Sequence, residues 1–519
     1  MPGTDRTREH LVSLAIFAVA LSIYLTFLTA HYSYDSVGGG ILLYQWMAHG
    51  KVEQLFQRYH ILYLAAAAGV EMILTRVGVE LDPLTLLQLL SATFAAGSVA
   101  VFHRLARALG LGVGLSATLT VLLGGGFCFW YYATTGESYP ISLFFLLLGF
   151  LSAVRAAPAA SWRRSALPGV WLGLAVCFHG TCVLALPGLV VVSWPSTDAP
   201  PRWRPVFGAM AATMLVIGIP YVTRYALRPG GVIGADASVF AAESGWTFPP
   251  RLLSEWRSLA YFMVFPDWPG FSSGHPGLAK LSGLSLLAMT LLPLTLLFKP
   301  DAVGRRHALA IGVWFAASFI FFSTYYPGTS KFAAYQWTPL LLLVGFAIQH
   351  IARQRTSRLV AVPLLATIVA VTVFCSFDLV RRQTDIESNA HLMRARAIGR
   401  LTQPDDVIVH LGRGADQFQN AYTPYFAARR SLSLEQSVAR AHRTAAPTVA
   451  SIEASVRSAV AAAGRVVVVS DALDSGASSL AFERDHRLPE GSLARMFAAH
   501  DPRLLGEDPA VGSLWVLTR

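Results

Sequence analysis

The run LVSLAIFAVALSIYLTFLTA, residues 11–30, contains no charged side chain, and HYSYDSVGGG, residues 31–40, follows it at once. At about 1.5 Å of rise per residue, a helix of this length reaches across the roughly 30 Å hydrocarbon core of a bilayer. No cleavage signal of small residues follows the run. We therefore interpret it as a retained transmembrane helix and not as a signal peptide.

Asp35 is the first acid after this helix, and it lies between hydroxyl and aromatic side chains just before three glycines. An acid at the hydrocarbon boundary costs desolvation energy, which makes Asp35 a candidate functional residue. The alternative interpretation is an interfacial anchor and turn, with the neighbouring tyrosines at the level of the lipid headgroups.

The composition of the chain indicates a polytopic membrane protein. Of its 519 residues, 54% are hydrophobic and only 14% are charged, with a mean hydropathy of +0.50. The net charge of +11 comes from basic residues in short loops between apolar runs, the pattern of the positive-inside rule, so nucleic acid is not expected as a partner. All four cysteines lie in apolar runs, so we expect neither a disulfide framework nor a cysteine zinc site.

Arginines in the loops orient the apolar runs. Arg6 and Arg8 precede the first run and place the amino terminus in the cytoplasm, with Asp35 on the outer side. The sequence predicts about eleven crossings, and this odd number places the region from Asp378 outside the cytoplasm. Nine of the predicted spans cover residues 11–30, 84–102, 113–130, 139–154, 206–222, 281–297, 308–323, 337–351 and 359–377.

Residues 167–194 form an apolar stretch with arginines on both sides, so it should cross the membrane an even number of times. It is too short for two full spans, so we expect two short helices with a break near His179. A broken helix at membrane depth is tolerated only where it lines a cavity or lies buried in protein. Residues 61–74, which include Glu71, are too short for a span and are expected to lie in the interface or to re-enter.

The composition changes after about residue 380. Residues 405–411, 465–470 and 513–518 are predicted strands, and residues 448–463 are a predicted amphipathic helix. Strands that alternate with helices indicate a small α/β domain. We therefore expect a transmembrane domain over residues 1–379, with an outer-face loop at 32–83, and a soluble extracytoplasmic domain over residues 380–519. Gly412-Arg413-Gly414 lacks the downstream glycine of a dinucleotide site and is interpreted as a turn.

The unusual polar residues of the membrane half gather on its predicted outer face. They are Asp35, His49, Arg58, His60, Glu137, His179, Arg224 and Lys331. Each has an ordinary alternative role, such as helix anchoring, a helix-start acid, a core histidine or a solvated loop charge. Their shared face favours a functional cavity, in which Lys331 with Arg58 or Arg224 neutralises a phosphate. The chemistry indicated is a carboxylate base, cations for a phosphate leaving group and an apolar groove for a lipid.

Four short motifs in this order resemble the GT-C membrane glycosyltransferases, and in particular their protein O-mannosyltransferase-like branch. The motifs are Tyr34-Asp35-Ser36, His60-Ile61-Leu62-Tyr63, Glu137-Ser138-Tyr139 and Phe178-His179-Gly180-Thr181. The chain departs from that family at Ser36, where a second acid is usual, and it lacks both prolines of the family's His-Pro-Pro-Leu-Tyr motif.

The resemblance implies a GT-C-like fold and transfer of a sugar from a polyprenyl-phosphate donor to an acceptor hydroxyl, with inversion and with Asp35 as general base. The acceptor would be a glycan, a lipid or a protein. Separately, the arginine-rich, lysine-poor and alanine-rich composition indicates a bacterial inner (plasma) membrane, and the predicted topology places the site at its outer face. No cofactor is implied; metal dependence varies across the superfamily, and Ser36 weakens the case for a metal. Donor and substrate contacts are assigned to Tyr34, Arg58, His60, Tyr63, Glu137, Tyr139, His179, Arg224 and Lys331.

Two other functions remain open from the sequence. A transporter or flippase of lipid-linked sugars would carry inverted repeats and a charged site at the midplane, and the sequence shows neither. A non-catalytic membrane scaffold for the outer domain would tolerate changes of the outer-face residues.

Overall fold

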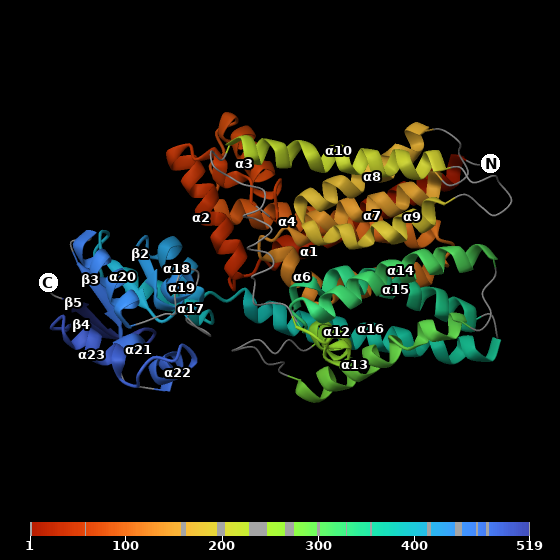
Figure 1. The fold of residues 1–519 in the computed structure, drawn as a ribbon. Coiled ribbons are helices and arrows are strands. Elements are labelled where there is room, and N and C mark those ends of the chain that lie inside the picture. The colour runs from red at the N-terminus through yellow and green to blue at the C-terminus, as the bar shows by residue number, and fades with distance from the viewer. Residues whose placement is uncertain are drawn as a thin grey trace. The chain divides into compact units, whose positions relative to one another are not determined.

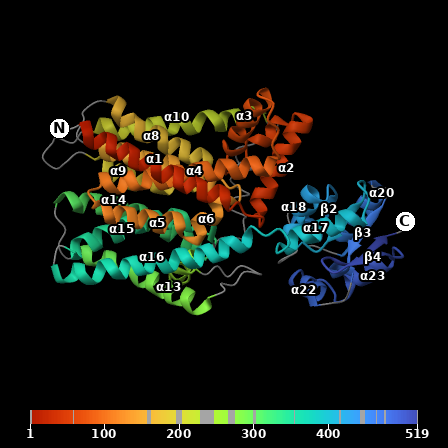
Figure 2. The same ribbon diagram turned by 180° about the vertical axis from the view of Figure 1, so that it is seen from behind.

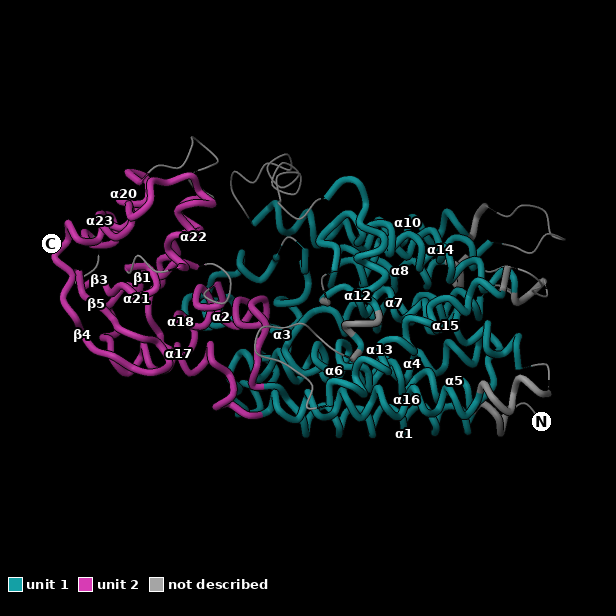
Figure 3. Tube along the Cα trace, turned by 90° about the horizontal axis from the view of Figure 1, so that it is seen from below, with its two compact units in different colours: residues 1–29, 42–384 teal, residues 30–41, 385–519 magenta. Residues whose placement is uncertain are grey.

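The computed structural model describes residues 3–57, 59–156, 162–194, 203–227, 247–264, 275–297, 302–328, 330–352, 355–412, 417–441, 449–462, 465–473 and 477–517. The chain divides into two compact units (Figure 3). Unit 1 comprises residues 1–29 and 42–384, and unit 2 comprises residues 30–41 and 385–519. The sequence did not predict that residues 30–41 belong with the carboxy-terminal residues.

Unit 1 is helical (Figure 1). Its first half contains α1 (Gly3–Thr26), the end of α2 (Tyr34–His49), η1 (Val52–Leu55), α3 (Tyr63–Arg76), α4 (Pro83–Ala108), α5 (Val113–Gly125), α6 (Phe127–Thr134), α7 (Tyr139–Ala156) and α8 (Trp162–Phe178). Its second half contains η2 (Gly180–Ala185), α9 (Leu186–Ser193), α10 (Trp203–Leu227), α12 (Leu252–Val264), α13 (Pro276–Met289), η3 (Leu292–Leu297), α14 (Ala302–Thr324), η4 (Ser330–Phe332), α15 (Ala333–Ile351) and α16 (Arg355–Gln383).

The predicted spans coincide with helices. Among the described residues, seven helices are long and apolar enough to cross a membrane, or eight if the bent pair α5–α6 is one span. The seven segments are Thr7–Thr26, Pro83–Ala108, Tyr139–Ala156, Val206–Leu227, Pro276–Thr295, Arg305–Thr324 and Val362–Gln383. Helices also occupy the remaining predicted crossings, but α8, η2–α9 and α15 do not meet this criterion. The polytopic helical fold is thus confirmed, whereas the count of eleven crossings stays a prediction.

The helices of unit 1 pack around α4, α7 and α8. α4 packs between α1 and α7, and α8 packs between α7 and α10 (Figures 1 and 2). The interior is large and apolar; for example, the Trp314 ring stacks on the Phe150 ring at a centroid distance of 4.6 Å. By contrast, only 11% of the apolar window of α1 is buried inside the protein, as expected for a helix that faces lipid.

Unit 2 is a mixed α/β domain, which confirms the predicted carboxy-terminal fold. Its sheet has the strand order β2-β1-β3-β5-β4, in which β1 is parallel to β2 and β3 while the β3–β5 and β5–β4 pairs are antiparallel. The strands are β1 (Val407–His410), β2 (Arg430–Ser433), β3 (Val466–Val469), β4 (Arg503–Asp508) and β5 (Gly512–Leu517). The helices are α17 (Ala390–Leu401), α18 (Gln419–Phe426), α19 (Leu434–Ala441), α20 (Val449–Ala462), α21 (Ser470–Leu473), α22 (Ala477–Asp485) and α23 (Ser492–Ala498).

An ion pair with a buried carboxylate joins the starts of the neighbouring strands β1 and β3 of unit 2. The Arg465 guanidinium donates to both carboxylate oxygens of Asp406, at 2.8 and 2.7 Å. Burial alone would raise the pKa of Asp406, but these hydrogen bonds and the backbone N–H of Gln403 outweigh it and hold the pKa below its ordinary value. The pair therefore contributes stability to the sheet at neutral pH.

Residues 30–41 pack within unit 2 as an additional segment. Asn389 Nδ2 donates to the Ala30 carbonyl (2.7 Å), His31 Nε2 lies 2.8 Å from Ser388 Oγ, and the Tyr422 hydroxyl donates to the Tyr32 carbonyl (2.7 Å). One glycine of the run at residues 38–40 has a packing role: a Cβ at Gly40 would lie only 3.0 Å from the Tyr425 ring. These contacts place the start of α2, with Asp35, in unit 2.

Candidate active site

The centre of the candidate site is the break between α8 and η2, where the sequence predicted it. α8 ends at Phe178, and His179 takes an extended backbone conformation with φ −155° and ψ 114°. Its side chain is buried, with 4% of its surface exposed, and its Nδ1 lies 2.7 Å from the Thr181 hydroxyl oxygen. The break thus turns the His179 imidazole into the interior of unit 1.

The segment between η1 and α3 compensates for the broken helix. A helix end leaves carbonyl groups without intrahelical partners, and burying them unpaired is costly. The Leu62 N–H donates to the Cys177 carbonyl (3.1 Å), and the Gly180 N–H donates to the Tyr59 carbonyl (3.1 Å). Two stretches more than a hundred residues apart therefore form one local structure.

His60 lies at the centre of this pairing. Its Nδ1 is 3.2 Å from the Phe178 carbonyl oxygen and 2.9 Å from the Ser138 hydroxyl oxygen. Because a carbonyl oxygen only accepts, this contact favours the tautomer with the proton on Nδ1, in which Nε2 is an acceptor. The His60 and His179 rings lie 4.8 Å apart between centroids. The structure therefore brings two imidazoles together at the helix break.

The turn between α6 and α7 forms the adjoining wall. Gly136 has φ +86°, a conformation that favours glycine, and a Cβ there would lie 3.1 Å from the Leu87 Cβ. The Tyr63 hydroxyl donates to the Gly136 carbonyl (2.6 Å), and the Ser91 hydroxyl donates to the Glu137 carbonyl (2.7 Å). These contacts fix the turn that carries Glu137, whose side chain is 4% exposed.

Aromatic side chains surround the His179 ring. The rings of Tyr139, Tyr335 and Phe332 lie 4.8, 5.4 and 6.1 Å from it between centroids. The Tyr335 hydroxyl shares a hydrogen bond with the Ser142 hydroxyl. The site is thus lined by aromatic rings, of which the two tyrosines carry hydroxyl groups.

Lys331 reaches this cluster from η4, which precedes α15. It lies close enough to His179 for the two side chains to interact electrostatically. The loop before η4 is held by Glu255, which accepts from the Gly328 N–H (2.7 Å) and from the Gln336 side-chain amide (2.7 Å). Glu255 therefore positions the segment that presents Lys331.

Tyr34 and Asp35 occupy the first turn of α2, in unit 2. The Ser33 hydroxyl accepts from the Ser36 N–H (3.0 Å) and caps this helix, and the two serine hydroxyl oxygens lie 2.6 Å apart. Ser36, which stands where the GT-C family usually has a second acid, is thus buried in the cap. The Asp35 side chain is exposed at the helix start, where the helix dipole favours a carboxylate. Burial and the nearby Asp35 raise the pKa of Tyr34.

The predicted site residues therefore fall into groups. The structure brings together His60, Tyr63, Glu137, Tyr139, His179 and Lys331 in unit 1. Tyr34 and Asp35 belong to unit 2. Arg224 is buried in the last turn of α10, with its guanidinium over the Tyr225 ring. Arg58 lies outside the described residues.

Several residues of this cluster were not predicted from the sequence. Ser138 lies between the predicted site residues Glu137 and Tyr139, and this position in the sequence could have identified it. Tyr335 lies four residues after Lys331 and reaches the site because η4 leads directly into α15. Thr181 belongs to the motif at residues 178–181 but was given no role from the sequence. Glu255 carried no signal, because its role arises from contacts that only the folded chain creates.

The arrangement of unit 1 suits binding of a negatively charged oxygen group. Two imidazoles, a lysine and tyrosine hydroxyls offer donors, and the aromatic lining lowers the local polarity so that these donors act more strongly. Within the part of the chain that the structure describes, no group of three or more His, Cys, Asp or Glu side chains is placed to share a metal ion.

No protein-family model and no curated protein matches the chain, but solved structures match nearly all of it. Crystal structures of ArnT from Cupriavidus metallidurans match in the apo state (TM-score 0.57, 14% identity) and bound to undecaprenyl phosphate (TM-score 0.56, 13% identity). Each match covers 97% of both chains. The oligosaccharyltransferase of Archaeoglobus fulgidus, in complex with Zn and sulfate, matches with a TM-score of 0.53 at 10% identity. That match covers 97% of this chain and 73% of the other.

These likenesses concern the fold: the chain shares the architecture of ArnT over nearly its whole length, which confirms the predicted polytopic helical fold with a carboxy-terminal α/β domain. The assignment to the O-mannosyltransferase-like branch stays a prediction.

Proposed function

We propose that the chain is an integral-membrane glycosyltransferase that moves a sugar from a polyprenyl-phosphate donor to an acceptor hydroxyl. The observation that carries the proposal is the match of nearly the whole chain to ArnT, one structure of which holds undecaprenyl phosphate. The polar cluster at the α8–η2 break supports it, because a lipid phosphate needs cationic donors beside an apolar wall.

In this proposal the donor phosphate binds at Lys331 and the two imidazoles, and its polyprenyl chain lies against the apolar helices. Arg58 and Arg224 are proposed as further cations for the phosphate, and Tyr34, Tyr63, Glu137 and Tyr139 as contacts to the sugar and acceptor. A sugar on a phosphate is already activated, because polyprenyl phosphate is a good leaving group.

The proposed reaction is a single displacement. The acceptor oxygen attacks the anomeric carbon, the bond from that carbon to the phosphate oxygen breaks, and the electron pair leaves with the polyprenyl phosphate. The acceptor proton passes to the Asp35 carboxylate, which acts as general base. Attack opposite the leaving group inverts the anomeric configuration.

The test uses the purified full chain in lipid with radiolabelled polyprenyl-phosphate sugars and membrane acceptors. We expect the wild type to transfer label and Asp35→Asn to lower kcat by about 10²- to 10⁴-fold, the range for loss of a general base. Glu80→Gln is the matched control, because Glu80 is an exposed acid in the same predicted outer loop. Its activity should equal that of the wild type.

Full transfer by Asp35→Asn would refute the base assignment while leaving the glycosyltransferase intact. A wild type that transfers no sugar from any polyprenyl-phosphate donor, but moves the labelled lipid between leaflets, would instead support the flippase.

The orientation of the chain is part of the proposal, with the amino terminus in the cytoplasm and residues 380–519 outside it. Glu490 is exposed in unit 2 and Arg155 is exposed at the end of α7, so each offers a position for a single introduced cysteine, while the four native cysteines are buried. In intact cells an impermeant thiol reagent should label Glu490→Cys and not Arg155→Cys. The reverse labelling would overturn the predicted topology.

A further inference from the structure

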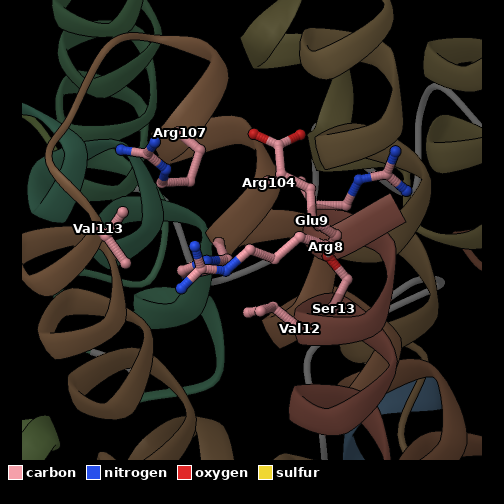
Figure 4. Close-up of a pocket in the computed structure, with 8 residues that line it drawn as sticks. Arg8, Glu9, Val12, Ser13, Arg104, Arg107 and Val113 are labelled. Carbon is pink, nitrogen blue, oxygen red and sulfur yellow. The ribbon is translucent and has the colours of Figure 1, made fainter. Parts of the chain in front are cut away.

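A second polar region of unit 1 encloses a hollow of about 340 Å³ between the start of α1, the end of α4 and the start of α5. Its polar lining comes from Arg8 and Glu9 on α1 and from His103, Arg104 and Arg107 on α4. Figure 4 shows these helix ends with the labelled arginines and Glu9 gathered around the hollow. A volume of this size is at the lower end of the range for small-molecule sites.

The turn after α4 gives the hollow a fixed wall. Arg107 Nη1 donates to the Leu111 carbonyl. The side-chain amide of Gln349, at the end of α15, donates to the Gly110 carbonyl (3.0 Å) and accepts from the Gly112 N–H (2.9 Å). The basic end of α4 is therefore held against two neighbouring elements.

The hollow contains polar groups that the described chain does not satisfy. His103 is only 5% exposed, and neither its Nδ1 nor the Nε of Arg104 has a hydrogen-bond partner among the described residues. The arginine Nε–H is a donor only, so it needs an acceptor. Three arginines face a single carboxylate, that of Glu9, so the hollow has an excess of positive charge. These observations indicate an anionic ligand that accepts hydrogen bonds.

The surroundings of the hollow are apolar and exposed. Val12 and Val113 belong to its lining and are 39% and 62% exposed. Leu11 and Leu14, on the same turns of α1, are each 62% exposed. Large aliphatic side chains exposed on a spanning helix face lipid tails. A ligand with an anionic head and apolar chains matches both parts of this surface.

We propose that the hollow binds the phosphate headgroup of an anionic phospholipid, with the arginines and His103 on the phosphate and the acyl chains along α1 and α5. Basic pockets between transmembrane helices are known to accept such headgroups. The hollow is separate from the candidate active site: Ser91, which supports that site, precedes His103 on α4 by twelve residues, or about 18 Å of helix. The proposal therefore does not depend on the glycosyltransferase assignment.

The experiment uses the purified full chain in neutral detergent and adds phosphatidylglycerol, phosphatidylcholine or inorganic phosphate. Native mass spectrometry measures bound lipid, and thermal unfolding measures stabilisation. We expect phosphatidylglycerol to bind and to raise the unfolding midpoint, while phosphatidylcholine and inorganic phosphate do neither. Stabilisation by inorganic phosphate to the same extent would overturn the lipid assignment in favour of a free anion, and equal binding of phosphatidylcholine would overturn the site.

Variants locate the binding. Arg8→Gln and Arg104→Gln should each weaken phosphatidylglycerol binding about fivefold, the effect of one arginine near an anionic headgroup. Arg155→Gln is the matched control, because Arg155 is exposed on the same predicted side of the membrane but does not line the hollow. An equal loss in Arg155→Gln would show that general surface charge, and not the hollow, attracts the lipid. If Arg104→Gln fails to fold, Arg8→Gln remains as the test, and unchanged phosphatidylglycerol binding in Arg8→Gln would overturn the proposal.

Discussion

The two ends of helix α4 carry polar groups of different kinds. Near its start, Gln88 and Ser91 donate to the carbonyls of Thr134 and Glu137 and so support the turn of the candidate active site. Near its end, His103 and Arg104 line the basic hollow with nitrogen atoms that have no partner among the described residues. At the start of α4 most polar groups form hydrogen bonds with each other. At the end of α4 there are more hydrogen-bond donors than acceptors.

The difference has a physical meaning. A network of short hydrogen bonds holds its side chains in place before a ligand arrives, which is what a site that orients a reacting group requires. A cluster of guanidinium groups beside lipid-facing leucines is instead completed by an anion, because buried donors without acceptors are costly. We therefore expect the candidate-site end of α4 to be sensitive to substitutions that disturb its hydrogen-bond geometry. The basic-hollow end should be sensitive to substitutions that remove positive charge.

The largest effect is expected from a substitution that strains the turn of the candidate site. Gly136→Ala should lower the free energy of unfolding by about 2 kcal/mol or more, because the φ of +86° disfavours alanine and its Cβ would crowd Leu87. Gly114→Ala, in the first turns of α5, is the control: nothing lies within 4 Å of its Cβ position. Replacing a helical glycine there should be neutral or stabilising by about 0.5–1 kcal/mol. Chemical denaturation measures both free energies of unfolding. An equal decrease in the two variants would show that the turn at Gly136 is not specially constrained.

A smaller effect is expected when one hydroxyl is removed. Ser138→Ala deletes the partner 2.9 Å from His60 Nδ1 and should cost about 1–2 kcal/mol, as for other buried hydrogen bonds. Ser13→Ala, beside the basic hollow, removes only a hydroxyl bond to the Glu9 carbonyl one turn earlier and should cost close to nothing. Thermal unfolding of the two variants measures the difference. Similar shifts would show that hydroxyl groups at the two ends contribute alike.

The apolar and basic pattern of the sequence was sufficient to predict the helices and the central strands. Runs without charge located α1, α4, α7 and α16, and basic flanks on both sides of residues 167–194 located the break at His179. The strands that were missed, β2 and β4, are the two edges of the sheet. Edge strands carry polar residues and are partly exposed, so they lack the apolar signal of a central strand.

The sequence could not predict which distant segments pair. The contacts of residues 59–62 with residues 177–180 depend on backbone groups, which any side chain supplies. The association of residues 30–41 with unit 2 depends on hydrogen bonds from Asn389 and Tyr422 to backbone carbonyls, which leave no periodic pattern in the sequence. For this reason Asp35 was identified by its chemistry, while its local packing was not.

Ionic strength should affect the two ends of α4 differently. High salt should weaken lipid binding at the basic hollow about fivefold, but it should not change the stability that Ser138 contributes at the other end. Raising the salt from about 0.1 M to 1 M shortens the screening length from about 10 Å to about 3 Å, so phosphatidylglycerol should bind about fivefold more weakly at the hollow. The stability difference between wild type and Ser138→Ala should stay constant, because a short hydrogen bond is not screened. Titrations of lipid at both salt concentrations measure the first effect. Binding that is insensitive to salt would argue against arginine recognition.

The smallest effect concerns the chain just after α1, whose start lines the basic hollow. Burial and, to a smaller extent, the nearby His391 lower the pKa of His31 to about 4, against an opposing effect of Asp385. In the unfolded chain the ordinary pKa is about 6.5, so the unfolded state binds the proton first as the pH falls from 6.5 to 4. The free energy that holds residues 30–41 in the folded state is therefore at its full value above pH 6.5. It decreases by about 1 kcal/mol or less as the pH falls below 6.5, because His31 is partly exposed.

Hydrogen exchange measures this loss in peptides that cover residues 30–41 at pH 7.5 and pH 5, after correction for the intrinsic exchange rate. Protection should fall at pH 5 in the wild type. His31→Gln retains a partner for the Ser388 hydroxyl but has no titrating group, so its protection should be the same at both pH values. Ser13→Ala, which leaves His31 unchanged, should behave like the wild type. Equal pH dependence in wild type and His31→Gln would assign the titration to another group, because His31 is then not the side chain whose proton uptake opens the segment.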